Sequence, residues 1–436
     1  MSAKARRFMF ITAVILFVVL TTGLSIFASG YRFNWQAAGG WQNLLVKTGS
    51  LLVESEPKGA LASLEQIHGH YSPLEKKTAE ERKTPLKVNN LLPGEYLLTL
   101  NLNGYLPYQK KISINPSMAT ILGEVVLFKN CLPMLVLPTE SNNFNYQPDG
   151  HLVALPEEEI IFDLIAEKTL IKISRDSQIN WVNGNQAVDG AKVINLDQGV
   201  VSDYTAQLGK VDNGLMSGNL LIYSQAGRLS SLETNTKKVQ VLKTQGPVID
   251  YEVVGDTLVV LSTQEADTRL EFIDYKNNRL LKETALLKAE DWDLKKEGQT
   301  LILSDRNHKI TYVVDAKIQE VQHLLRDSHQ PVLLNKAELA YAEGSEIHLY
   351  NLDLQKDSLL TRLGSEIKSL SAGPSGYLAY ATDQEVGTLD LNDPKKETIT
   401  LFSGANISQL KFEKTGNALF FFAEIGNKKG LYKIDL

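Results

Sequence analysis

The sequence has a single cysteine, Cys131, among its 436 residues. One thiol excludes a disulfide within the chain and any zinc or iron–sulfur site made from several cysteines. A basic surplus is also missing, because 45 Lys and Arg side chains stand against 51 Asp and Glu, a net charge of −6. Nucleic-acid binders normally carry excess positive charge to match phosphate, so no nucleic acid is expected among the partners.

Linear catalytic motifs are missing as well. The sequence contains no Walker loop, no dinucleotide-binding glycine pattern and no H-E-x-x-H zinc motif. The segment Gly373-Pro374-Ser375-Gly376 does not satisfy the G-x-S-x-G pattern of a nucleophile elbow. We therefore predict a protein that is not an enzyme, with no catalytic residue, no cofactor and no metal site.

Acidic residues are absent from residues 1–30, where the basic residues are Lys4, Arg6 and Arg7. The remainder of the chain consequently carries 42 basic and 51 acidic side chains, a net charge of −9. Residues 8–28 have no charge, and a helix of that length at ~1.5 Å per residue spans the ~30 Å hydrocarbon core of a bilayer. This stretch is predicted to be a transmembrane helix in contact with the lipid bilayer.

The charge distribution also predicts a topology. Since the basic cluster precedes the apolar stretch, the positive-inside rule keeps the N-terminus in the cytoplasm and sends the rest of the chain outside. Tyr31, Trp35 and Trp41 would then lie near the outer interface. The alternative is a signal peptide cleaved near Ala28 or Gly30, but its apolar region is normally only ~7–15 residues, which favours an uncleaved anchor.

A small β domain is predicted for residues 45–128, after a linker at residues 31–44 that contains Gly39-Gly40. Short apolar runs are separated there by Pro and Gly, which is typical of a compact antiparallel β-sandwich. Only residues 73–82 suit a helix, and they are charged and expected to be solvated.

Four motifs occur in order within this domain: S-x-P-x-G-A at residues 55–60, T-P at 84–85, L-x-P-G-x-Y ending at 96, and G-Y at 104–105. This set resembles the PEGA domain of prokaryotic envelope proteins. The residues that carry the resemblance are Pro57, Gly59, Ala60, Thr84, Pro85, Pro93, Gly94, Tyr96, Gly104 and Tyr105. The resemblance implies a β module for display or interaction, located in the prokaryotic envelope and without known chemistry.

The domain departs from the PEGA pattern in two places. Lys58 replaces the acidic residue of the motif, and residues 64–83 are longer than the usual connection and lack the customary glycine ahead of Thr84. His68 and His70 in this connection form an H-x-H pair that would share one face of a strand. Because no third ligand is evident nearby, exposed loop histidines are preferred to a metal site.

From residue 141 onward the sequence repeats itself with two markers. The first is a glycine, once an asparagine, shortly before an apolar strand: Gly150, Gly184, Gly218, Gly255, Gly298, Asn335, Gly376 and Gly416. The second is an acid or asparagine at the end of the next strand: Asp163, Asp197, Glu233, Asp274, Asp315, Asn351, Asp390 and Asp435. Neighbours in the second series lie 34 to 45 residues apart, a period typical of β-propeller blades.

Residues 130–436 are therefore predicted to form a β-propeller of eight blades. The second unit, with residues 185–189, makes a poor strand, so seven blades is the alternative. The turn at Gln147-Pro148-Asp149-Gly150 resembles the P-D-G turn of TolB-type and WD-type propellers. The last unit stops after Asp435 without an outer strand, and we expect residues 132–137 to pair with it and close the ring.

Asp291 and Asp293 flank Trp292 in an expected inner strand and could line a channel. Strand alternation instead favours a buried Trp292 with both acids exposed to solvent, and the whole run 290–297 is expected to be a solvated surface. No sialidase-like Asp-box and no repeated Trp-containing quinone pattern occurs in any unit.

These inferences predict a single-pass protein of the prokaryotic plasma membrane, with its N-terminus in the cytoplasm and its bulk outside. Residues 1–30 form the tail and anchor, and the propeller serves as a binding platform for an envelope protein or a cell-wall or surface polymer. The alternative is an extracytoplasmic hydrolase or lyase that acts on polysaccharide in the propeller channel.

Overall fold

The structure of the chain is a computed structural model that describes residues 3–33, 45–68, 82–141, 144–148, 150–265, 267–297, 300–373, 376–393 and 395–436. The chain divides into two compact units, Met1–Cys131 and Leu132–Asp435. Most of the expected linker, including Trp35 and Trp41, lies outside the described residues.

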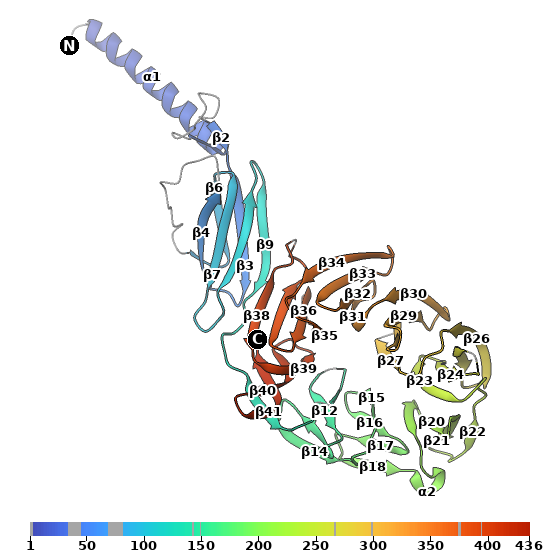
Figure 1. Ribbon diagram of the computed structural model, residues 1–436. Coiled ribbons are helices and arrows are strands. Elements are labelled where there is room, and N and C mark those ends of the chain that lie inside the picture. Colours follow the sequence, from blue (N-terminus) through green and yellow to red (C-terminus); the bar gives the residue numbers. More distant parts are fainter. Residues whose placement is uncertain are drawn as a thin grey trace. The chain divides into compact units, whose positions relative to one another are not determined.

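The first element of the chain is helix α1 (Ala3–Ala28), which is one uninterrupted helix in Figure 1. Its span from Arg7 to Ala28 has a mean hydropathy of 2.5 and none of it is buried within the protein. The hydroxyl of Thr12 donates to the Phe8 carbonyl at 2.9 Å, so this polar group is satisfied inside the helix. By length and composition the helix could cross a membrane, and a signal sequence would share both properties.

Two sheets form the domain that follows a short antiparallel pair, β1 (Tyr31–Phe33) and β2 (Leu45–Lys47). The first sheet has the order β6 (Leu86–Leu91), β3 (Gly49–Glu56), β9 (Ala119–Val126). The second has the order β5 (Arg82–Lys83), β4 (Leu61–His68), β7 (Gly94–Asn101), β8 (Tyr108–Ile114). Their inward faces share one core, because alternate residues such as Tyr96, Leu98 and Leu100 are buried.

Two expectations for this domain need correction. The sandwich is not fully antiparallel, because β3 pairs with β9 in parallel: the chain crosses from the second sheet back to the first after β8 and reaches β3 running in the same direction. A helix over residues 73–82 is not found at its last position, since Arg82 belongs to β5; residues 73–81 lie outside the described residues.

The described residues of the second unit form eight four-stranded antiparallel sheets. The first three comprise β11 (Asn145–Tyr146), β12 (Leu152–Leu155), β13 (Ile160–Asp163), β14 (Lys168–Lys172); β15 (Ile179–Asn183), β16 (Gln186–Asp189), β17 (Lys192–Asn195), β18 (Val200–Asp203); and β19 (Asn213–Ser217), β20 (Leu220–Gln225), β21 (Arg228–Glu233), β22 (Val239–Val241). A short helix, α2 (Thr205–Leu208), connects the second sheet to the third.

The next four sheets are also built from strands consecutive in the chain. They comprise β23 (Val248–Val254), β24 (Thr257–Thr263), β25 (Thr268–Asp274), β26 (Arg279–Leu286); β27 (Trp292–Glu297), β28 (Thr300–Asp305), β29 (Ile310–Asp315), β30 (Glu320–Arg326); β31 (His329–Asn335), β32 (Glu338–Glu343), β33 (Glu346–Asn351), β34 (Lys356–Arg362); and β35 (Ile367–Ala372), β36 (Tyr377–Thr382), β37 (Glu385–Asp390), β38 (Thr398–Ser403).

The eighth sheet joins the two ends of the unit. It has the order β10 (Met134–Pro138), β41 (Lys428–Asp435), β40 (Ala418–Ile425), β39 (Ala405–Phe412). Strand β10 lies antiparallel to β41, with Leu135 opposite Tyr432. The expected pairing of residues 132–137 with the last unit is therefore found, with a strand that begins two residues later, at Met134, and ends at Pro138.

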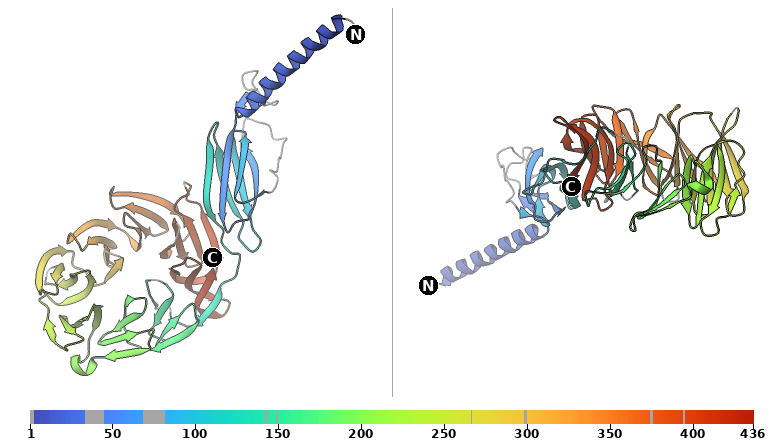
Figure 2. Two further views of the ribbon diagram at one scale, coloured as in Figure 1. Left: turned by 180° about the vertical axis from the view of Figure 1, so that it is seen from behind. Right: turned by 90° about the horizontal axis from the view of Figure 1, so that it is seen from below.

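Apolar cores lie between successive sheets. Phe272 from the fourth sheet packs with Leu301 from the fifth, for example, and both are fully buried. The eighth sheet packs on the first in the same way, since Phe420 and Leu431 share a core with Val153. Figure 1 shows the sheets in chain order with first strands such as β15, β23 and β31 on the inner side, and Figure 2 shows the same succession from behind.

The second repeat unit differs from its prediction in two respects. Residues 186–189, expected to make a poor strand, form β16, in which Ala187 and Val188 are fully buried. The acid assigned as its marker, Asp197, lies beyond the strand, and β17 ends at Asn195. Burial of two small apolar residues between neighbouring sheets is sufficient for this strand, although its polar flanks obscure the pattern.

Candidate functional site

Two motif segments of the first unit meet around Thr84, which is 4% exposed. Its hydroxyl oxygen accepts hydrogen bonds from the backbone N–H groups of Gly59, at 3.1 Å, and Ala60, at 3.0 Å. Its own N–H donates to the Ala60 carbonyl at 2.9 Å, and the Ser55 hydroxyl lies 2.5 Å from the Thr84 hydroxyl. Thr84 therefore joins the turn after β3 to the start of β6. Pro57 lies in that turn, and Pro85 directly follows Thr84 in the chain.

The remaining motif residues lie in turns or at the strand ends next to them. The hydroxyl of Tyr96 donates to the Leu92 carbonyl at 2.8 Å and so spans the turn that contains Pro93 and Gly94. Burial raises the pKa of Tyr96, and it stays a neutral donor. Gly104 has φ +84°, a conformation that favours glycine, and its carbonyl accepts the N–H of Asn130 at 2.9 Å.

These ten residues thus make turns and backbone hydrogen bonds, and they do not converge on one pocket. Thr84, Gly59 and Ala60 lie at the end of the sandwich where Leu61 pairs with Asn101, close to the Gly104 turn. Pro93 and Gly94 lie at the start of β7, the opposite end. Lys58, which replaces an acid of the pattern, is exposed.

In the second unit, acidic side chains gather on the first strands of the fourth and fifth sheets. Asp250 and Glu252 on β23 alternate with the buried Tyr251 and Val253, so both project from the opposite face. Strand β27 of the next sheet contacts β23 and contributes Asp293. We call Asp250, Glu252 and Asp293 the inner-strand carboxylates.

The surroundings shift the protonation of this group. Burial raises the pKa of Asp250 from 3.8 to about 7, with smaller upward contributions from Asp293 and Glu252, while the Tyr251 N–H, a hydrogen-bond donor at 2.8 Å, opposes the rise. Burial also raises the pKa of Glu252. Asp250 consequently exchanges its proton near neutral pH.

Lysine and arginine side chains form ion pairs with Asp293 and Glu252. Lys295 lies 3.1 Å from the carboxylate of Asp293, and Arg306 lies 3.5 Å from it. Lys296 donates to the Val253 carbonyl at 2.5 Å and lies 4.0 Å from Glu252. Lys296 thus bridges the fourth and fifth sheets, whereas the ion pairs of Asp293 lie within the fifth sheet, and together these cations neutralise part of the negative charge.

The expectation of a solvated run at residues 290–297 holds for part of it. Asp291 is exposed, as predicted, and its carboxylate lies 3.6 Å from Arg306. Asp293 and Trp292 are both half-buried, because β27 is a first strand that faces its neighbour β23. Glu297 keeps contact with water, but neighbouring protein atoms exclude part of its hydration, and this desolvation raises the pKa of its carboxyl.

The hollows found among the described residues lie elsewhere. One of about 600 Å³ lies at the end of the fourth sheet, between the approach to β23 and the β24–β25 loop, and is lined by residues that include Gly246, Gln264 and Arg269. A second, of about 350 Å³, is lined by residues that include Lys172, Asp189 and Asp203. Neither is lined by the inner-strand carboxylates.

The loops of the second unit divide into two sets by topology. First strands of neighbouring sheets run in the same direction, as the hydrogen bonds from the Leu410 and Phe412 N–H groups to the hydroxyls of Ser369 and Ser371 show. Loops from second to third strands, and from fourth strands to the next sheet, therefore lie at one rim. The other connections lie at the opposite rim.

The two rims differ in charge. The described loops of the first rim carry 13 acidic residues, Glu140, Glu157, Glu158, Glu159, Asp176, Asp212, Glu265, Asp267, Glu290, Asp291, Asp327, Glu366 and Asp383, against 6 basic ones, Arg175, Lys210, Lys243, Lys288, Arg306 and Lys309. Those of the opposite rim carry 7 acidic residues, Glu167, Asp197, Asp256, Asp353, Asp393, Glu397 and Glu413, against 8 basic ones, Lys237, Lys238, Lys276, Lys317, Lys336, Lys395, Lys396 and Lys414. We call the first the acid-rich rim.

Of the predicted histidine pair, His68 ends β4 and His70 lies outside the described residues. One group of potential metal ligands is present in the part of the chain that the structure describes: Glu343, Glu346 and His348, on the sixth sheet. Sequence reasoning missed this group, because it considered His348 only for a fixed position in every repeat.

Comparison with known proteins gives one domain match and several similar structures. Residues 48–123 match the PEGA domain model. A search of curated proteins found no match. Among solved structures, BamB from Moraxella catarrhalis is 14% identical, with 70% of this chain and 100% of that chain covered and a TM-score of 0.47.

Two further structures are similar at the same level. A eukaryotic initiation factor is 14% identical, with coverage of 70% and 94% and a TM-score of 0.49. A chain of the mitotic checkpoint complex is 15% identical, with coverage of 72% and 99% and a TM-score of 0.42. No function passes from these structures to this chain. With four-stranded sheets in succession and the domain match, the chain carries a PEGA domain followed by a propeller-like unit.

Proposed function

We propose that this protein is a single-pass protein of the prokaryotic plasma membrane that binds a basic protein of the envelope. Its N-terminus would lie in the cytoplasm, and the PEGA domain and the propeller outside. The acid-rich rim of the propeller would be the binding surface. The single observation that carries the proposal is the difference in charge between the two rims.

An uncleaved anchor is supported by the length of the apolar stretch and by the basic residues Lys4, Arg6 and Arg7 that precede it. Extraction of membranes with carbonate tests this part. The full-length protein should stay in the membrane pellet, and its release into the soluble fraction would contradict an anchor. Protease added to intact cells should digest the region after residue 30.

A closed propeller of eight blades is supported by two features. Strand β10 pairs with β41, and Phe420 of the eighth sheet shares a core with Val153 of the first. Closure would leave each sheet covered on both faces and the blades rigid. Rigid scaffolds that present loops at a rim are well suited to binding, because the loops vary without loss of the core.

The partner chemistry follows from the charge. Thirteen acids against six bases on the acid-rich rim favour a cationic surface, since complementary charge increases the association rate and selects among partners. Anionic polymers would be repelled. Between the two partner classes expected from the sequence, a protein with a basic surface is therefore preferred to an acidic polymer.

The experiment uses matched charge-neutralising variants of the full chain in detergent. The first is the triple variant Glu157→Gln, Glu159→Gln, Glu265→Gln on the acid-rich rim, and the control is Glu167→Gln, Asp353→Asn, Glu397→Gln on the opposite rim. All six residues are exposed. Binding of fluorescent oligolysine is measured at low and moderate salt, followed by capture of basic proteins from envelope extracts.

We expect the first variant to lose several-fold in oligolysine affinity and to lose a basic envelope protein that the wild type and the control retain. Equal binding by both triple variants would refute the acid-rich rim as the binding surface. Capture of an acidic polysaccharide that persists in both variants would favour the polymer instead.

A second candidate function rests on Asp250. A carboxyl that exchanges its proton near pH 7 beside Asp293 has the property of a general acid or base, as an extracytoplasmic polysaccharide hydrolase or lyase would need. Turnover of a panel of envelope glycans by the wild-type chain, abolished in Asp250→Asn, would favour this enzyme. Turnover that Asp250→Asn leaves unchanged would exclude Asp250 from it.

A further inference from the structure

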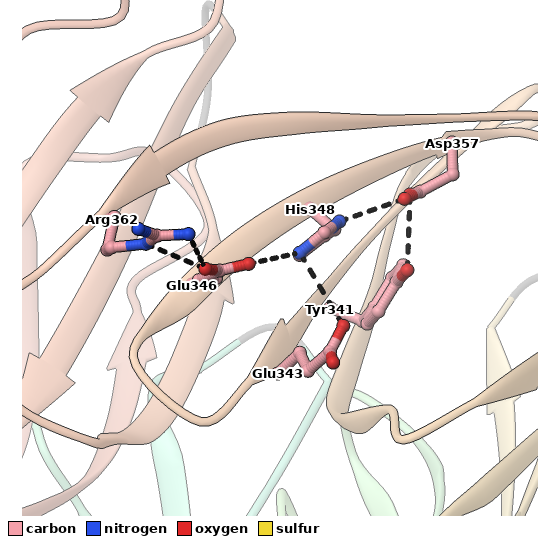
Figure 3. A network of polar contacts seen from close by, with 6 residues as sticks. All are labelled: Tyr341, Glu343, Glu346, His348, Asp357 and Arg362. Atoms are coloured by element: carbon pink, nitrogen blue, oxygen red, sulfur yellow. Dashed lines mark hydrogen bonds and ion pairs between the residues drawn. The ribbon is translucent and has the colours of Figure 1, made fainter.

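A compact group of ionisable side chains lies on the sixth sheet, on the hairpin of β32 and β33. Glu343 ends β32 and Glu346 begins β33, and the two residues are direct cross-strand partners. His348 and Tyr341 form the next pair of partners with side chains on the same face. Figure 3 shows these four side chains together with Asp357 and Arg362 from β34.

The histidine ring is held in one orientation. Its Nδ1 lies 2.9 Å from Oδ2 of Asp357, whose Oδ1 accepts the Tyr341 hydroxyl at 3.1 Å. The Tyr341 ring stacks on the imidazole, with centroids 5.1 Å apart and an interplanar angle of 21°. A carboxylate that accepts the N–H of one ring nitrogen fixes the tautomer and leaves the other nitrogen, Nε2, as the donor atom for a metal.

Two carboxylates face this second nitrogen. Nε2 of His348 lies 3.2 Å from Oε2 of Glu346 and 3.7 Å from Oε2 of Glu343. In a tetrahedral zinc site with bonds of about 2.0–2.2 Å, neighbouring ligand atoms are roughly 3.3–3.6 Å apart. The two distances from Nε2 lie about 0.1 Å on either side of this range, and the three ligand atoms all lie within 4.8 Å of one another, close enough for one ion to contact all three.

The net negative charge of the side chains around Nε2 of His348 favours binding of a cation there. Like charges directly opposite each other in a hairpin repel, and Arg362 pairs with only one oxygen of Glu346, donating from Nε to Oε1 at 2.7 Å. The three carboxylates and the one guanidinium around the imidazole carry a net charge of −2.

The site is open on one side. His348 is 9% exposed, whereas the Glu343 side chain is 48% exposed. An ion could enter past Glu343, and water could complete its coordination. Three protein ligands with one free position is the arrangement of exchangeable zinc sites rather than of closed structural ones.

We propose that Glu343, Glu346 and His348 bind a divalent transition-metal ion of the zinc type, with Asp357 as the positioning residue of the histidine. This proposal does not depend on the partner of the acid-rich rim. The competing occupant of the same position is a proton on Nε2, which would make His348 an imidazolium held by the same carboxylates.

The test uses the full chain purified in detergent, freed of metal with a chelator and titrated with Zn²⁺ by calorimetry. We expect one Zn²⁺ per chain at these residues. Glu343→Gln, which changes an exposed side chain, and His348→Gln should each lower the affinity by about 100-fold or more, and Asp357→Asn by roughly 10–100-fold. The melting temperature of the wild type should rise with Zn²⁺ concentration, and that of the ligand variants should not.

Two controls identify the source of any binding. The double variant His68→Gln, His70→Gln removes the H-x-H pair and should leave the site on the sixth sheet unchanged. Circular dichroism of each variant, compared with that of the wild type, tests whether the variant is folded. No Zn²⁺ binding by folded wild-type protein, or binding lost only in the H-x-H variant, would overturn the proposal. Co²⁺ should give the visible absorption of a tetrahedral site in the wild type and lose it in Glu343→Gln.

Discussion

The PEGA domain and the propeller-like unit are both made of β-strands, but they join them differently. In the PEGA domain β3 pairs with β9, about seventy residues later in the chain, and the two sheets share one core. In the propeller-like unit, seven of the eight sheets are meanders of consecutive strands, and apolar cores lie between neighbouring sheets. The first domain therefore depends on a few distant pairings, and the second on many local ones that a single terminal strand completes.

The two regions also differ in charge. Residues 45–128 have 9 basic and 8 acidic side chains, whereas residues 132–436 have 31 basic and 43 acidic ones. The negative charge of the chain is thus concentrated in the propeller-like unit. Under the proposed function, the PEGA domain is a nearly neutral spacer and the propeller carries the recognition surface.

The largest effect is expected where the eighth sheet meets the first. Phe420→Ala empties a fully buried position in their shared core and should lower the free energy of unfolding by about 3–5 kcal/mol. Hydrogen exchange should quicken in both the first and the eighth sheets. Quickening in the eighth sheet alone would show that the two sheets are not coupled, and Leu98→Ala in the PEGA core provides the comparison.

The next effect concerns the hydrogen bonds around Thr84. Thr84→Val removes the hydroxyl that accepts the Ala60 N–H, whereas the Gly59 N–H keeps the Thr84 backbone carbonyl as an acceptor at 2.9 Å. The variant should destabilise the PEGA domain by about 1–3 kcal/mol. Thr84→Ser keeps the hydroxyl and should cost much less. Urea unfolding monitored through exchange of residues 45–68 measures both variants. A loss in Thr84→Ser as large as that in Thr84→Val would mean that packing of the methyl group matters as much as the hydroxyl, and would contradict the dominant role of the hydroxyl.

A smaller effect follows from the raised pKa of Asp250. Between the ordinary pKa of 3.8 and the raised pKa of about 7, the folded chain keeps a proton on Asp250 that the unfolded chain has released. The contribution of Asp250 to the free energy of unfolding is therefore fully present below pH 4 and is lost as pH rises through about 7. Asp250→Asn should remove that loss, about 1–2 kcal/mol for a partly exposed group, when urea midpoints at pH 5 and pH 8 are compared. The exposed Asp353→Asn should retain the wild-type dependence on pH.

The smallest effect concerns the ion pair between outer strands of the fourth and fifth sheets. Lys282 on β26 lies 2.6 Å from Glu320 on β30, and both side chains are well exposed. Lys282→Ala should therefore cost about 0.2–1 kcal/mol, and the difference should vanish in high salt. A larger loss, in urea midpoints measured at two salt concentrations, would mean that surface charges contribute to the contact between sheets as well as the apolar cores.

The sequence was informative where a residue type is tied to a backbone requirement. Glycines such as Gly218 and Gly255 precede second strands, and acids such as Asp274 and Asp315 end third strands, because turns and strand ends restrict the residues they accept. The rule predicted the wrong strand end in the second repeat, because β17 ends at Asn195 and the acid, Asp197, comes two residues later. The parallel pairing of β3 with β9 leaves no local pattern that a linear reading could detect.

The candidate sites were harder to predict for a related reason. Asp250 and Asp293 come together only because first strands of neighbouring sheets lie side by side, which depends on register across more than forty residues. Glu343, Glu346 and His348 lie close in sequence, as E-x-x-E-x-H, and could have been found from strand alternation around a two-residue turn. They were not predicted because metal ligands were expected at the same position in every repeat, and these three residues occur in one repeat.

The pairing of β10 with β41 also governs the order of events during synthesis. One strand of the eighth sheet emerges from the ribosome almost three hundred residues before its partner, so the sheet stays incomplete while the intervening strands are made. The PEGA domain, whose last strand ends at Val126, can fold during that interval. Until β41 is made, the backbone groups of β10 that it will pair with remain available to other chains.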